Sequence, residues 1–182
     1  MRRVVVLFAS LVLVLALAAP ALATHTNVTD DNDVRGVLDL SAVVFRHESG
    51  PYQWVFKTYG RWTHRKIWDH GYLIVELDTR GDEAIDYFVV LRSDGRSMIG
   101  ELFRRRTTGR EVHLRSLDGW RAGSHGAGVE VPRRALKYGA ARTSFLWRTL
   151  SSFTGARCRV TCIDLAPDGG TMVEQELPTT EP

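Results

Sequence analysis

From Gly36 onward, short apolar runs alternate with turn-forming residues, and this rhythm restricts the fold more than any other feature. In several runs the apolar side chains recur at every second position, as at Leu73, Val75 and Leu77, which is the period of a strand with one buried face. The predicted strands are Val37–Phe45, Tyr52–Tyr59, Tyr72–Asp78, Tyr87–Arg92, Ser97–Phe103, Glu111–Leu114, Gly128–Val131 and Thr143–Phe153. The turn signals between them are Ser49-Gly50-Pro51, Arg80-Gly81-Asp82, Asp94-Gly95, Thr108-Gly109 and Asp118-Gly119. Because parallel strands need long crossover connections, these short turns predict an all-β fold, an antiparallel β-sandwich of jelly-roll-like type.

Helix signals are weak in this chain. The segment Pro132–Gly139 begins with proline and ends with glycine, which suits one or two helical turns. Trp62–His70 has room for another single turn. We therefore expect one or two short helical turns beside the strands.

The first 23 residues have the layout of a secretory signal peptide. A positive start at Arg2 and Arg3 is followed by the apolar run Val4–Ala19 and by Ala-Leu-Ala at 21–23, the small-x-small pattern of a cleavage point. The apolar run is shorter than the roughly 20 residues that span a bilayer, and no second such run follows. We therefore expect cleavage before Thr24, a secreted, extracellular protein, and no transmembrane segment in the mature form.

The rest of the chain has the length of one domain. Residues 24–35 are polar and acidic, with Asp30, Asp31 and Asp33, and are predicted to be a flexible lead-in. Residues 36–170 are predicted to form a single β-sandwich domain, and residues 171–182 a polar C-terminal tail.

The charge of the chain is nearly balanced. It has 24 Lys and Arg against 21 Asp and Glu, a formal net charge of +3 that falls by two when Arg2 and Arg3 leave with the signal. A surface this balanced gives no strong attraction to nucleic acid, so we expect no nucleic-acid partner. The clustered arginines, such as Arg104-Arg105-Arg106, suit solvated strand ends, or a patch for an anionic envelope polymer.

Two cysteines, Cys158 and Cys162, are separated by three residues. Outside the cell, two thiols this close are expected to oxidise, and the pair is predicted to be a structural disulfide at a tight turn. A redox pair would have the spacing C-x-x-C at a helix start, and a zinc site would need further ligands nearby.

A hard cation is the one cofactor that the residues suggest, and otherwise we expect none. Asp78, Asp82 and Asp86 flank a turn between two predicted strands, where carboxylates can surround Ca²⁺. The acidic residues of the segment 24–35 would add ligands if the N-terminus folds back. However, Arg80 occupies a place where a calcium loop prefers oxygen, and Asp and Gly populate turns for conformational reasons alone.

Three tryptophans fall outside the clearest strands. Trp62, Trp68 and Trp120 lie in predicted loops beside basic residues that include Arg61 and Arg121. Exposed aromatic rings beside hydrogen-bonding side chains are typical of sugar binding, because the ring covers the apolar face of a sugar and the polar groups take its hydroxyls. The alternative is that the three rings close the open ends of the sandwich.

The order of several motifs resembles a group of secreted bacterial β-sandwich proteins of unassigned function. The motifs that carry this resemblance are Asn32-Asp33-x-Arg35-Gly36-x-Leu38-Asp39, Tyr72–Asp78, Gly81-Asp82, Asp86-Tyr87, Pro132-x-x-x-Leu136, Phe145-x-Trp147, Cys158…Cys162 and Ala166-Pro167-Asp168. The layout is more distantly similar to family 9 carbohydrate-binding-module-like and DOMON-like domains, which bind sugars, haem or calcium. Members of the group tend to have an acidic residue where Arg80 stands, so the resemblance gives only weak support for calcium binding at this turn.

Three functional hypotheses follow. The first is a secreted, non-catalytic module that binds extracellular or cell-wall polysaccharide. The second is a structural or protein-interaction domain of the cell envelope. The third is a small hydrolase, which would need an acid and base pair such as Glu76 with Asp78 or Glu101 in a cleft. No catalytic motif is present, so we expect no enzymatic activity and favour the first hypothesis.

Overall fold

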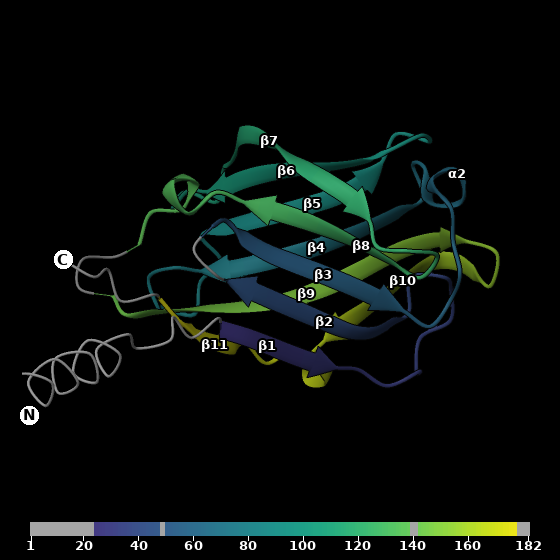
Figure 1. Cartoon of the computed structure of the whole chain (residues 1–182), viewed down its shortest axis with the longest axis horizontal. Coiled ribbons are helices and arrows are strands. Elements are labelled where there is room, and N and C mark those ends of the chain that lie inside the picture. The colour runs from purple at the N-terminus through teal and green to yellow at the C-terminus, as the bar shows by residue number, and fades with distance from the viewer. Residues whose placement is uncertain (1–23, 48–49, 139–141, 178–182) are drawn as a thin grey trace, which may run out of the picture.

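Figure 1 shows the computed structural model, which describes residues 24–47, 50–138 and 142–177; the predicted signal peptide lies outside them. The fold is all-β and antiparallel, as predicted. The strands are β1 (Thr24–Thr29), β2 (Leu40–His47), β3 (Tyr52–Thr58), β4 (Gly71–Asp78), β5 (Tyr87–Ser93), β6 (Met98–Arg105), β7 (Glu111–Arg121), β8 (Gly126–Val131), β9 (Ser144–Gly155), β10 (Cys158–Ala166) and β11 (Val173–Glu176). The helical turns are α2 (His64–Ile67), η1 (Arg133–Ala135) and η2 (Asp168–Gly170), and the two that were predicted are α2 and η1.

The strands form one sheet that folds over into two layers. Their order is β1-β2-β3-β8-β7-β6-β5-β4-β9-β10, and β11 adds to β9. β7 serves both layers, because residues 111–118 pair with β6 whereas residues 119–121 pair with β8. Most connections are hairpins; the β3–β4 and β8–β9 connections instead pass from one layer to the other (Figure 1). The two ends of the strand order, β1 and β10, are left as the edges of the sheet.

Two corrections concern the ends of the domain. The segment 24–35 was predicted to be a flexible lead-in, but its first half is β1, which pairs with β2 from Thr24 to Thr29. The predicted polar tail also contains a strand, since β11 pairs with β9. Both strands are polar and have no alternating apolar pattern, so only their pairing in the folded chain reveals them.

A third correction concerns Asp118-Gly119, which was predicted to be a turn. Both residues lie inside β7, which runs on to Arg121. A Cβ atom at Gly119 would stand 2.6 Å from Leu91 Cδ1 and 3.2 Å from the backbone of Met98. Glycine is therefore required here by the close approach of β5 and β6 to the part of β7 that crosses between the layers.

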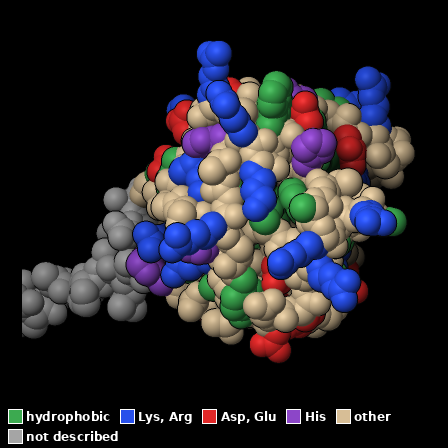
Figure 2. Space-filling view, turned by 90° about the vertical axis from the view of Figure 1, so that its right-hand side faces the viewer, with side chains coloured by type: hydrophobic (Ala, Val, Ile, Leu, Met, Phe, Trp, Pro, Cys, Tyr) green, Lys and Arg blue, Asp and Glu red, His purple; other side chains and the backbone are tan. Residues whose placement is uncertain are grey.

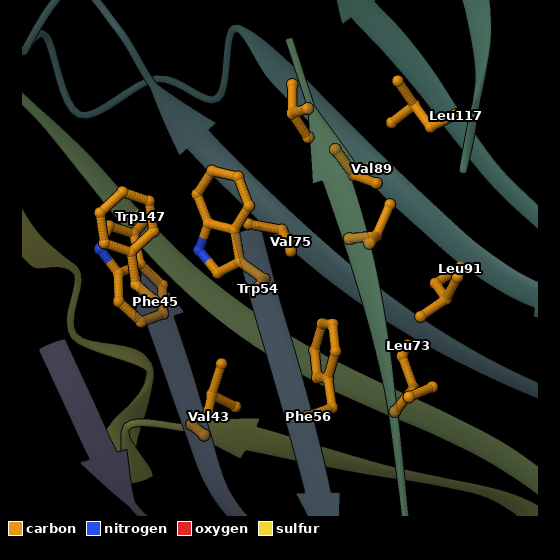
Figure 3. Close-up of a cluster of buried hydrophobic side chains, with 14 of the residues drawn as sticks. Val43, Phe45, Trp54, Phe56, Leu73, Val75, Val89, Leu91, Leu117 and Trp147 are labelled. Carbon is orange, nitrogen blue, oxygen red and sulfur yellow. The ribbon is translucent and has the colours of Figure 1, made fainter. Parts of the chain in front are cut away.

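The core lies between the two layers and is rich in aromatic rings (Figure 3). Phe45 of β2 lies 5.0 Å from Trp54 in its own layer, and 5.9 and 6.0 Å from Phe145 and Trp147 of β9 in the other, between ring centroids. Trp54 and Trp147 meet edge to face across the layers at 6.3 Å. These side chains are fully buried, so they supply both apolar burial and favourable ring geometry.

Side chains rather than strand ladders connect the layers near the open edges of the sheet. Ser151 Oγ of β9 donates to the carbonyl of Leu38 at 2.5 Å, and the N–H of Leu40 donates to Asp164 Oδ2 of β10 at 2.6 Å. Thr26 of β1 donates to Gln175 of β11 at 2.8 Å. We call this junction between β1–β2 and β10–β11 the seam.

We expect the substitution Phe45→Ala to lower the free energy of unfolding by about 3–5 kcal/mol, because it leaves a cavity where four aromatic rings meet. Val160→Ala is the matched control: this side chain is 84 % exposed, so its loss should change the free energy by no more than about 0.5 kcal/mol. Urea denaturation measures both values. Similar values for the two variants would contradict the assignment of the core.

His47 makes the stability of the fold depend on pH. Burial and the neighbouring Arg133 lower the pKa of this imidazole below 6.5. The unfolded chain therefore takes up a proton at His47 as the pH falls through 6.5, while the folded chain does not, and this stabilises the unfolded state. As the pH falls from 7.5 to 5, we expect the urea midpoint of the His47→Gln variant to decrease less than that of the parent. Equal losses in the two proteins would contradict this.

Candidate functional site

The three tryptophans expected at a sugar site occupy three different environments. Trp62 is buried, only 3 % exposed, and its indole N–H donates to Thr58 Oγ1 at 3.0 Å. The Arg121 guanidinium lies 3.3 Å from the centroid of the Trp62 ring and donates to the Trp62 carbonyl at 2.9 Å. The prediction of Trp62 and Arg121 as ligand-binding residues is therefore corrected: they bind each other and close one end of the sandwich.

Trp68 and Trp120 remain accessible. Trp68 follows α2 and is 50 % exposed, and its ring lies against Gly95, where an added Cβ would stand 3.2 Å from Cδ2 and Cε3. Trp120 is half-buried and lies in β7, not in a loop as predicted. Its ring packs on Gly128 of β8, where a Cβ would stand 2.2 Å from Cζ2. Each ring therefore packs directly on the backbone of a glycine. A larger residue at Gly95 or Gly128 would displace the ring.

The end of the sandwich that carries Trp68 has exposed basic residues around α2, together with the exposed acidic residues Asp69 and Asp94. Figure 2 looks at this end and shows Lys and Arg side chains spread among separate hydrophobic, acidic and histidine side chains. Arg61 is exposed and lies two residues before Thr63, the N-cap of α2. Of the predicted ligand-binding set, the structure therefore leaves Trp68, Trp120 and Arg61 accessible.

The predicted calcium ligands Asp78, Asp82 and Asp86 do not form an open oxygen cage. Asp78 is fully buried at the end of β4 and accepts the backbone N–H groups of Arg80, Gly81 and Glu83 at 2.6–2.9 Å. This geometry supports the alternative that the carboxylates shape a turn.

Arg80 supplies the positive charge of this turn. It forms an ion pair with Asp86 Oδ1 at 2.5 Å and a longer contact with Asp82 at 3.6 Å. Thr79 donates to the other oxygen of Asp86 from both its N–H and its hydroxyl. The residues of this turn therefore do not fit a bound cation.

Of the carboxylates in the hydrolase hypothesis, Asp78 is buried in its turn, and Glu76 and Glu101 lie on the outer face of the sheet and are already paired. Arg148 donates to Glu76 at 2.7 Å, and Arg92 donates to Glu101 at 2.9 Å. The bond from Arg92 lowers the pKa of Glu101, whereas a general acid needs a raised pKa. The geometry gives the hydrolase hypothesis no support.

Cys158 and Cys162 form the predicted disulfide, with Cα atoms 5.6 Å apart. The pairing of β10 with β9 shifts register between these two residues, since Cys158 faces Gly155 and Cys162 faces Phe153. The bond therefore closes a bulge immediately after the β9–β10 turn, which holds the bulged strand in place.

Sequence reasoning missed a carboxylate cluster at the seam. Single carboxylate oxygens of Asp33, Asp39 and Asp164 all lie within 4.8 Å of one another. Asp33 and Asp39 come from the segment between β1 and β2, and Asp164 comes from β10. Asp30, which follows β1, is 4 % exposed and interacts electrostatically with Asp164 and with Asp168 of η2. We call these five residues, Asp30, Asp33, Asp39, Asp164 and Asp168, the seam cluster.

The surroundings of the seam cluster disfavour the negatively charged form of its carboxyl groups. Burial, with the nearby Asp164 and Asp168, raises the pKa of Asp30 to about 8. Burial and Asp164 also raise the pKa of Asp39 to about 6. Burial raises the pKa of Asp164 although this carboxylate accepts the Leu40 N–H. Acidic residues in the lead-in and the Ala-Pro-Asp motif were visible in the sequence, but nothing there brings residues 30–39 beside residues 164–168.

Comparisons of the chain with family models, with curated proteins and with solved structures find no match. The resemblance to secreted β-sandwich proteins therefore stays a prediction. In the described part of the chain, no helix has the length and apolar character needed to cross a membrane.

A substitution at Asp78 distinguishes a turn from a metal site. We expect Asp78→Ala to lower the free energy of unfolding by about 1–3 kcal/mol, because three backbone N–H groups lose their acceptor. The loss should be the same in EDTA and in CaCl₂, as followed by urea denaturation. Asp82→Ala, at an exposed position of the same turn, is the control and should have little effect. A loss seen only in CaCl₂ would instead indicate a cation at this turn.

Proposed function

We propose that this protein is a secreted, non-catalytic module that binds extracellular or cell-wall carbohydrate. The observation that carries the proposal is the placement of Trp68 and Trp120 on the backbones of Gly95 and Gly128. A ring held against a backbone has few alternative positions, so little conformational freedom is lost when a flat apolar surface such as a sugar face packs on it.

The two rings lie on different elements: that of Trp68 on the tip of the β5–β6 hairpin and that of Trp120 on β8. Trp68 contacts Gly95 in the turn between β5 and β6, and Trp120 contacts Gly128 of β8. The alternation of β7 turns Trp120 away from the core, since Gly119 faces Leu91 and Arg121 faces Trp62. Two accessible rings on different elements suit a polymer that contacts each of them with a different sugar unit.

Polar groups near Trp68 support the same ligand class. Arg61, Arg65 and Lys66 are exposed around α2, and none of them forms an ion pair within the described residues. Long donors of this kind can bind sugar hydroxyls or the carboxylates of an acidic polysaccharide. An anionic wall polymer is therefore the ligand class that Arg61, Arg65 and Lys66 favour.

The alternative is a structural or protein-interaction domain of the cell envelope. The observation in its favour is the outer face of the larger layer, where half-buried apolar side chains stand in register on neighbouring strands. The ring pair of Phe88 and Phe103, stacked at 5.0 Å between centroids and 5° between planes, lies on this face. A salt-sensitive partner recovered by crosslinking would favour this alternative.

The test is isothermal titration of the oxidised protein with soluble oligosaccharides and with peptidoglycan fragments. We expect saturable binding that Trp68→Ala and Trp120→Ala each weaken about tenfold, because each variant removes one ring contact. Trp68→Phe keeps an aromatic ring and should bind better than Trp68→Ala. Calorimetry is needed because the variants remove the fluorescent side chains themselves.

Leu114→Ala is the matched control, since this side chain is 42 % exposed on β7 but lies on the part paired with β6, away from Trp120. Thermal unfolding must show that all variants are folded. The proposal fails if no glycan binds, or if both tryptophan variants bind as tightly as the parent.

A further inference from the structure

The seam cluster contains buried carboxylate oxygens that, among the described residues, have no hydrogen-bond partner other than a neighbouring carboxyl group. Both oxygens of Asp30 and one oxygen of Asp39 are shielded from solvent and accept no hydrogen bond from any other group in the described part of the chain. Each of these two residues is only 4 % exposed. Buried polar atoms are almost always paired, so unpartnered carboxylate oxygens beside further carboxylates indicate a missing positive group.

The described side chains do not supply that positive charge. No ion pair within the described residues joins Lys, Arg or His to a member of the seam cluster. The turn at Asp78 differs, because Arg80 neutralises Asp86 there. A buried charge is strongly destabilising unless it is paired or coordinated to a metal.

We propose that the seam cluster is a binding site for a hard divalent cation of the Ca²⁺ class, with Asp33, Asp39 and Asp164 as its ligands. The three carboxylates already place one oxygen each within 4.8 Å of the others, which is close enough for one ion to contact all three. The donors are all oxygen, which Ca²⁺ prefers, whereas Zn²⁺ and Cu²⁺ favour nitrogen or sulfur. Asp30 interacts electrostatically with two of these ligands, Asp33 and Asp164, and with Asp168.

Ca²⁺ suits the cluster better than Mg²⁺ does. Ca²⁺ takes six to eight oxygens in flexible geometry, so protein carboxylates, backbone carbonyls and water can complete the shell. Mg²⁺ requires near-octahedral geometry and keeps several of its waters. Because two of the three aspartates are buried, the site disfavours an ion that keeps its waters. Asp33 is exposed, so the ion can enter from solvent.

A cation here would join the two layers of the sandwich. Asp33 and Asp39 precede β2 in one layer, and Asp164 belongs to β10 in the other. The ion would cross the edge that strand pairing leaves open, beside the bond from the Leu40 N–H to Asp164. Its predicted effect is therefore stabilisation of the fold, and this does not depend on any carbohydrate.

The experiment treats the full protein with EDTA, removes the chelator, and titrates it with CaCl₂ by calorimetry and thermal unfolding. Parallel titrations use MgCl₂, and NaCl at the same ionic strength to measure screening alone. We expect saturable Ca²⁺ binding with a dissociation constant on the order of 10⁻³ M or tighter, the range of extracellular calcium modules. The melting temperature should rise by roughly 5–10 °C near saturation, and Mg²⁺ should have a smaller effect.

The variants Asp39→Asn and Asp164→Asn should abolish the Ca²⁺ response. In EDTA, Asp39→Asn should melt no lower than the parent, because it removes a like charge from the cluster; this separates loss of a ligand from loss of the fold. Asp31→Asn is the matched control, since Asp31 is exposed in the same segment and lies outside the cluster. It should keep the full response.

The proposal is overturned if the parent binds no Ca²⁺ and its melting temperature does not respond at about 10 mM, ten times the weakest of the dissociation constants expected for such modules. The carboxyl groups would then share protons instead of holding an ion. It is also overturned if Asp39→Asn and Asp164→Asn keep the response.

Discussion

The contact of Phe45 and Trp54 with Phe145 and Trp147 holds the two layers together, and the rest of the structure depends on it. A single antiparallel sheet with one apolar face must fold over to bury that face. The bend falls in β7, which pairs with β6 along one part and with β8 along the other. Gly119 permits this crossing because there is no room for a side chain beside Leu91.

Folding one sheet over has a cost at its edges. β1 and β10 end the strand order, and the seam beside them is closed by hydrogen bonds from the hydroxyls of Thr26 and Ser151 and from the backbone N–H of Leu40 to the Asp164 carboxylate. The seam cluster lies at this same junction. Its buried, unpaired carboxylates are unfavourable for an apo fold, and a bound cation would convert this repulsion into a link between the layers.

The accessible rings of Trp68 and Trp120 depend on glycine as well. Glycine has the same physical role under Trp68 and Trp120 as it has in β7: the absence of a Cβ lets another group approach the backbone closely. Trp62 shows the contrasting case. Its ring is covered by Arg121, and its indole N–H donates to Thr58. Trp62 follows Arg61 in the sequence, but in the folded protein it is a buried packing residue and offers no binding surface.

The sequence by itself determined the all-β antiparallel class, most strand positions, the two helical turns at α2 and η1, and the pairing of Cys158 with Cys162. These features follow from local signals, namely a two-residue apolar period, turn residues and close spacing along the chain. Tertiary structure decided that β1, β10 and β11 are strands, because their sequences lack a sustained alternating apolar pattern and become strands by pairing with β2 and β9. It also decided that Trp62 is buried, and that Asp33 and Asp39 lie beside Asp164. More than 120 positions separate those residues, and no local pattern records which distant carboxylates a folded sheet brings together.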